Sequence, residues 1–215
     1  MYYRKMDATQ LFNSLASEFI TLFIVIDPIG VLPLFVGLTK RMPTPQARKV
    51  AIKSIFIAGI VLLGFAFLGQ ILLEALSVRI TSFRIAGGII LFLFGVKMIF
   101  GAEFEEKSAQ SAETGHDIAV FPLAIPSIAG PGAMLAVVVQ IAYGAQTTIE
   151  LFSKIFVLLA VLSTTLVLFI FAKPVTKIIG VTGGSVIVRV MGILLSAIAV
   201  ESVTLALREL HAFAP

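Results

Sequence analysis

The residue of this sequence with the clearest capacity for chemistry is Asp27, a carboxylate in the middle of a long apolar run. It begins a dense set of helix-breaking residues that also includes Pro28, Gly30 and Pro33. A proline inside a helix removes a backbone donor and clashes with the preceding turn. We therefore expect a helix to break at Asp27, with a carboxylate held at the break.

A second stretch of the same design lies in the other half of the chain. Its prolines, Pro126 and Pro131, repeat the five-residue spacing of the first pair, and Gly130 and Gly132 flank the second proline. Proline suits the first position of a helix, and the residue before it serves as the cap. Each stretch is therefore expected to expose the N-terminus of a second half-helix, after Asp27 in one case and after Gly130 in the other.

Two half-helix starts have a defined ligand chemistry. Their free N–H groups and positive dipole ends attract a carboxylate, while the carbonyls that end the preceding half-helices attract a cation or an ammonium group. The pair therefore suits a small zwitterion, and the glycines leave little room for a ligand side chain. The expected substrate-binding residues are Asp27, Pro28, Ile29, Gly30, Ser127, Ile128, Ala129, Gly130, Pro131 and Gly132.

Two roles for Asp27 are compatible. The simpler role is an N-cap that organises the kink. The other is contact with a substrate ammonium, a proton or a sodium ion, because an acid inside a membrane span marks a functional site by default. Asp27 is thus the expected ion-coupling residue, and we expect no metal ligands, no cofactor and no catalytic residues.

Composition indicates the class of protein. Of the 215 residues 59% are hydrophobic and 13% are charged, against about 25% charged in a typical soluble domain, and the mean hydropathy is +1.07. Runs of about 20 apolar residues match the length that crosses a bilayer as a helix. The chain is expected to be an all-α polytopic membrane protein in the cytoplasmic membrane. Its net charge of +4 suits anionic lipid, and no nucleic-acid partner is expected.

Six spans are expected, in two halves. Residues 1–102 form a first three-helix repeat, 103–117 a polar linker and 118–215 a second repeat. The first and fourth spans are expected to be discontinuous. The predicted spans are 13–38, 51–73, 83–101, 118–142, 153–172 and 186–207.

The halves resemble one another in two places. The first span of each carries a proline pair, and the third span of each begins with an Arg-x-x-Gly motif, at Arg84 and Arg189. Because three is an odd number of spans, the second half must enter the membrane from the opposite side. This predicts an inverted repeat, which is common in secondary transporters. Both arginines are expected to reach the headgroups or to form a gating ion pair.

Lysine and arginine predict the orientation. The excess of these residues on the side of the loops after the first, third and fifth spans places that side in the cytoplasm and both termini outside. Arg4 and Lys5 alone argue the other way. The cytoplasmic set is Lys40, Arg41, Arg48, Lys49, Lys53, Lys97, Lys107, Lys173, Lys177 and Arg189, against Arg4, Lys5, Arg79, Arg84, Lys154 and Arg208 outside.

Other polar residues within the spans are secondary candidates. Thr21, Gln140 and the run 163–165 are able to face a pathway, although hydroxyls often bond their own helix backbone. Glu18 and Glu201 lie nearer span ends and are expected at the interface. Close helix packing is the simplest reading of Gly87, Gly88, Gly95 and Gly192.

The two proline stretches also carry a family resemblance. "IDPIGVLPLF" and "FPLAIPSIAGPGAM" resemble the paired signatures of the MarC family of integral membrane proteins, and the similarity extends over nearly the whole chain. That family includes a transporter of small neutral amino acids and is grouped with the LysE-type amino acid exporters. The resemblance implies a secondary active transporter of glycine, alanine or similar solutes, working by alternating access and coupled to protons or sodium.

Functions of other classes have less support. Aspartyl chemistry needs a second acid beside the first, and none is expected at the depth of Asp27. His116 and His211 lie outside the predicted spans, and the sequence has no phosphate-binding loop or helical zinc motif, so an enzyme is not expected. A passive channel or an exporter of other small solutes stays open, because broken helices also line pores. An oligomer is compatible with all these features.

Overall fold

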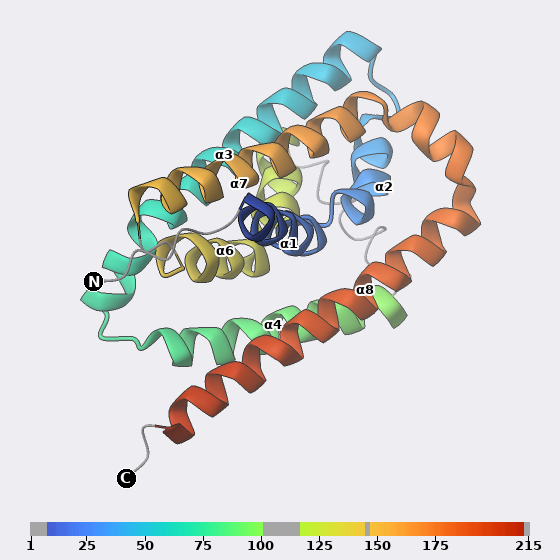
Figure 1. Cartoon of the computed structure of the whole chain (residues 1–215). Helices are drawn as coiled ribbons and strands as arrows, with labels where there is room; N and C mark the ends of the chain where they lie inside the picture. The colour runs from blue at the N-terminus through green and yellow to red at the C-terminus, as the bar shows by residue number, and fades with distance from the viewer. Residues whose placement is uncertain (1–7, 101–116, 145–146, 213–215) are drawn as a thin grey trace.

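The computed structural model describes residues 8–100, 117–144 and 147–212, and all the regular secondary structure of these residues is helical (Figure 1). The predicted all-α class is confirmed. Apart from Asp117, the predicted linker 103–117 lies outside the described residues, as do Arg4 and Lys5. The helices are α1 (Ala8–Ile26), α2 (Pro28–Thr39), α3 (Thr44–Ala75), α4 (Ile80–Phe100), η2 (Ala119–Ile128), α6 (Pro131–Val137), η3 (Val138–Ala142), α7 (Thr148–Ile170) and α8 (Ala172–Ala212), with η2 and η3 π-helical.

Five helical stretches of the described chain are long and apolar enough to cross a membrane on their own. The bent pair Ala119–Ile128 and Pro131–Ala142 becomes a sixth if it crosses as one span. Each predicted span overlaps one of these stretches, so the polytopic class is confirmed and the number of spans is five or six. The five are Asn13–Thr39, Thr44–Ala75, Ile80–Phe100, Thr148–Ile170 and Thr182–Leu210.

The helices form a central group with a helix pair on each side of it. α1, α2 and the segment η2–α6–η3 lie in the middle, with α3 and α7 side by side above them and α4 and α8 below in Figure 1. α4 and α8 pack through small residues, because a Cβ on Gly95 would lie 2.7 Å from the carbonyl oxygen of Gly192. Close packing of helices through glycine is thus confirmed here.

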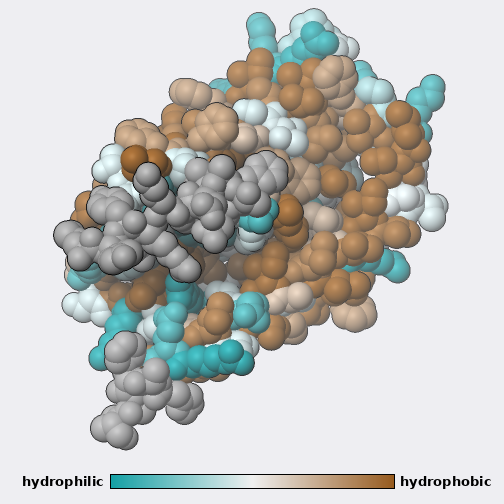
Figure 2. Space-filling view, in the orientation of Figure 1, coloured by the Kyte–Doolittle hydropathy of each residue, from teal (hydrophilic) through white to brown (hydrophobic). Residues whose placement is uncertain are grey.

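The outer surface is apolar. Brown, hydrophobic atoms dominate the face shown in Figure 2, and large side chains such as Phe56, Phe152 and Phe156 are each about two-thirds exposed or more. Soluble proteins rarely expose large contiguous apolar patches. Surrounding lipid accounts for this surface.

Two helix limits differ from the prediction. α3 begins at Thr44, well before residue 51, because Arg48 and Lys49 point outward while the helix backbone continues past them. The segment after the fifth span is also helical, up to Gly180, whose left-handed φ of 67° kinks α8. A side chain at Gly180 would be strained by that backbone conformation. The last candidate span lies after this kink, at Thr182–Leu210.

Candidate functional site

The first break has the predicted geometry. Helix α1 ends at Ile26, Asp27 adopts a left-handed conformation (φ 50°, ψ 60°), and Pro28 opens α2. The Gly30 N–H donates to Asp27 Oδ1 at 3.1 Å, which satisfies one of the free donors at the helix start. Asp27 is only 4% exposed. The role of Asp27 as an N-cap is confirmed, and its role in ion coupling stays a prediction.

Gly30 is matched to this cap. A Cβ built on Gly30 would overlap the Asp27 carboxylate and lie 3.0 Å from Oδ1. The carboxylate is therefore folded over Gly30 and occupies the start of α2. An anion at that helix start would have to displace it, so the two breaks are chemically unequal.

The second break is sharper and less regular. Phe121 and Ile125 each have extended backbone angles inside η2, because each precedes a proline, which disfavours the helical conformation. Both peptide bonds into Pro122 and Pro126 are cis. The predicted discontinuity is confirmed, but it begins earlier than expected, and Pro122 was the missed signal.

The helix after the second break starts without a side-chain cap. Gly130 is extended (φ −81°, ψ 171°) and Pro131 is the first helical residue. The segments on the two sides differ in direction by 56°. A Cβ on Gly130 would lie 2.5 Å from the Pro126 carbonyl oxygen, so only glycine fits this turn.

The two breaks lie next to each other. α1 packs on α6 and α2 packs on η2, so the two broken segments run in opposite directions. A Cβ built on Gly132 would overlap Leu91 and lie 3.6 Å from Val25 Cγ1, just before the first break. Ile26 and Ile128 belong to the same buried core. Of the predicted site residues, Asp27, Pro28, Ile128 and Ala129 are buried, Ile29, Gly30, Ser127, Gly130 and Gly132 are half-buried and Pro131 is exposed.

Comparison with known proteins decides the family. The model of the MarC family integral membrane proteins matches residues 12–211. The chain belongs to the MarC family. It is 35% identical to a UPF0056 membrane protein of Archaeoglobus fulgidus, over 92% of this chain and 94% of the relative. It is 31% identical to the UPF0056 inner membrane protein YhgN of Escherichia coli K12, over 88% and 93%. No solved structure matches.

This MarC protein has a cavity on each side of the first break. One, of about 170 Å³, is lined by Ile29, Leu32 and Pro33 of α2 and by α8 around Gly180. The other, of about 320 Å³, reaches Thr21 and Val25 of α1, before the break. The breaks thus stand between two cavities along the same span.

The larger cavity gathers residues that the sequence did not connect. Its polar lining is Thr21, Arg84, Gln140, Glu201 and Ser202, from α1, α4, η3 and α8. The Thr21 hydroxyl donates a hydrogen bond to the Ser17 carbonyl oxygen of its own helix, as hydroxyls in helices often do. Glu201, expected at the membrane interface, lines this cavity. No pattern of spacing in the sequence indicates that these residues of α4 and α8 lie beside the same cavity.

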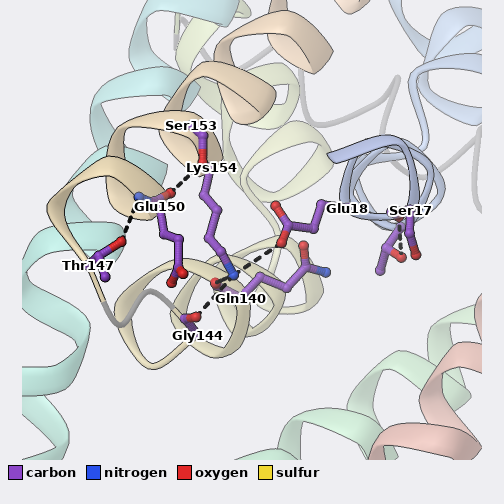
Figure 3. A network of polar contacts seen from close by, with 9 residues as sticks. Ser17, Glu18, Gln140, Gly144, Thr147, Glu150, Ser153 and Lys154 are labelled. Atoms are coloured by element: carbon purple, nitrogen blue, oxygen red, sulfur yellow. Dashed lines mark hydrogen bonds and ion pairs between the residues drawn. The ribbon is translucent and has the colours of Figure 1, made fainter. Parts of the chain in front are cut away.

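A partly buried ion pair closes the end of the second broken span (Figure 3). Lys154 Nζ lies 3.1 Å from Glu18 Oε1 and donates to the carbonyl oxygens of Gln140 (3.0 Å) and Gly144 (3.1 Å). The lysine and glutamate side chains are only 15% and 17% exposed. The pair joins α1 to α7 and satisfies carbonyls at the end of η3. Sequence placed Lys154 among the loop residues and missed this contact.

Two further ion pairs join segments that are distant in the sequence. Arg84 Nη1 lies 2.7 Å from Glu209 Oε1, so this arginine does form an ion pair. Lys53 of α3 pairs with Asp117, just before η2. The hydrogen bond from Lys53 and a second from the Ala119 N–H lower the pKa of Asp117, which is therefore ionised at neutral pH. Among the described residues, no group of three acids or histidines is placed to hold a metal ion.

Proposed function

We propose that this MarC protein is a secondary active transporter of small neutral amino acids, glycine and alanine among them, across the cytoplasmic membrane by alternating access. The observation that carries the proposal is the crossing of two broken spans in opposite directions, with their breaks adjacent in one buried core. Broken helices at mid-span are tolerated only against protein or a wet cavity. Secondary transporters use such breaks to bind substrate.

The unequal breaks suit the two ends of an amino acid. The start of the helix at Pro131 has no side-chain cap, so its N–H groups and dipole favour the substrate carboxylate. The Asp27 carboxylate at the other break favours the ammonium group. Gly130 and Gly132 are in tight contact with protein atoms, so we expect the substrate beside the second break to have little or no side chain.

In this proposal the two cavities serve as the access routes to the site, one in each direction. One lies before Asp27 along the first span and the other lies after it. In the proposed cycle two inverted three-helix repeats, 1–102 and 118–215, rock against each other and open one cavity at a time to the site. Asp27 couples the movement to a proton or a sodium ion. No chemical reaction is catalysed and no other cofactor takes part.

Uptake into proteoliposomes tests the proposal. Purified protein should accumulate radiolabelled glycine above the external concentration when a pH or sodium gradient is imposed, and unlabelled alanine should compete. Equilibration without accumulation under every gradient would indicate a passive channel. No glycine flux beyond protein-free vesicles would refute the proposed substrate class.

A further inference from the structure

The cavity of about 320 Å³ has the properties of a binding site in its own right. Its volume falls within the range of about 300–1,000 Å³ that is typical of small-molecule sites. Five separate elements line it, and the lining combines apolar side chains with charged and polar ones. A small number of polar groups on an apolar surface is the usual composition of a ligand pocket.

Two buried polar atoms and one exposed carboxylate around this cavity have unused bonding capacity. Arg84 Nε and Gln140 Oε1 are buried without a hydrogen-bond partner among the described residues. Glu201 has no ion-pair or hydrogen-bond partner among them either. A buried donor or acceptor that stays unpaired costs about 1–3 kcal/mol. A ligand that pairs with these atoms would recover that energy.

The arginine and the glutamate lie about one helical turn apart along two neighbouring helices. Gly88 of α4 contacts Ala199 and Val203 of α8, and these two residues flank Glu201. Arg84 is one helical turn before Gly88. A positive and a negative side chain therefore face one cavity from adjacent helices.

We propose that this cavity is a second binding site for zwitterionic amino acids, which we call the vestibule site. Arg84, whose Nη1 is paired with Glu209, binds the carboxylate through the unpaired Nε side of its planar guanidinium. Glu201 with Gln140 Oε1 binds the ammonium group. The proposal takes its ligand class from the proposed function. Amino acid held here is one layer of side chains away from the central site between the breaks.

That layer consists of apolar side chains that line the cavity. Val25, Leu91 and Leu135 line the cavity, and Val25 and Leu91 are also the side chains that cover Gly132 at the second break. All three are buried. Movement of Leu91 away from Gly132 would join the vestibule site to the central site.

Cysteine labelling tests the vestibule site directly, because the native chain contains no cysteine. Ser202 lines the cavity, so in reconstituted Ser202→Cys protein glycine should slow modification by a small thiol reagent. Acetate and methylamine, each carrying one charge, should protect far less. Arg84→Gln should raise the half-protecting glycine concentration about tenfold or more, the usual effect of losing a charged hydrogen bond.

Two matched controls make the result specific. Arg189→Gln removes the equivalent arginine of the second half, which does not line the cavity, and should leave protection unchanged. Glycine should not alter labelling of Ser82→Cys, an exposed position on α4.

The outcomes separate this proposal from the transport proposal. Absence of protection at Ser202→Cys, or equal protection in Arg84→Gln, would each overturn the vestibule site. Glycine accumulation by the wild-type protein is measured independently. Accumulation without protection refutes the vestibule site alone, and protection without any flux refutes transport alone.

Discussion

The fit between Asp27 and Gly30 predicts a reversal in the effect of one substitution. In the native protein, Gly30→Ala would drive a methyl group into the Asp27 carboxylate and displace the cap from the Gly30 N–H. Loss of an N-cap costs about 1 kcal/mol, with a range of about 0.5–2. A chain of this size loses about 2–4 °C in melting temperature per kcal/mol, so we expect a decrease of about 1–8 °C.

The same substitution should have the opposite effect once the carboxylate is gone. Asp27→Gly tolerates the left-handed conformation and costs only a few tenths of a kcal/mol as a cap. In that background Gly30→Ala meets no carboxylate and gains the helix propensity of alanine, about 0.5–1 kcal/mol. Gly30→Ala should then raise the melting temperature by about 1–4 °C.

Thermal unfolding in detergent, followed by circular dichroism at 222 nm, measures all four proteins of this cycle. The chain has no tryptophan, so tryptophan fluorescence cannot follow it. An equal decrease on Gly30→Ala in both backgrounds would show that the clash is not with Asp27. The account of the first break would then be wrong.

Three further predictions concern charge and orientation. Asp27→Asn keeps a capping oxygen, so the fold should survive, whereas gradient-driven uptake of glycine should fall to equilibration; full coupling would leave Asp27 as a cap alone. Lys154→Met strands a partly buried glutamate and should destabilise the protein by about 3 kcal/mol, with partial recovery on adding Glu18→Gln; an unchanged melting temperature would contradict the structural role of the pair. In intact cells, an impermeant maleimide should label a cysteine added after Pro215 but not Ser108→Cys, which lies outside the described residues; the reverse pattern would invert the orientation.

The breaks were predictable from sequence because their causes are local. Pro28 and Pro131 each fix a backbone angle and remove a hydrogen-bond donor whatever surrounds them. The apolar runs indicate which segments lie in the lipid bilayer. The cap residue before each helix start, Asp27 or Gly130, can also be predicted locally, because it directly precedes the proline. The span positions follow from composition along the chain in the same way.

Features that depend on contacts between distant segments could not be predicted. Lys154 meets Glu18 only because α7 crosses α1 near the end of η3. Likewise, Arg84 and Glu201 share a cavity because α4 and α8 pack through glycines at one particular register. Neither contact can be recognised from the spacing of residues in the sequence. From sequence, each of these side chains is therefore considered on its own and expected near the membrane surface.

Glycine binding to a matched pair of valine variants tests most directly the claim that substrate sits between the breaks. A Cβ on Gly132 meets Leu91 and Val25, whereas a Cβ on Gly37, also in a broken span, meets no atom within 4 Å. By calorimetry and by uptake, Gly132→Val should bind and accumulate no glycine while remaining monodisperse, and Gly37→Val should match the wild type. Undiminished glycine uptake by Gly132→Val would contradict the location of the substrate between the breaks.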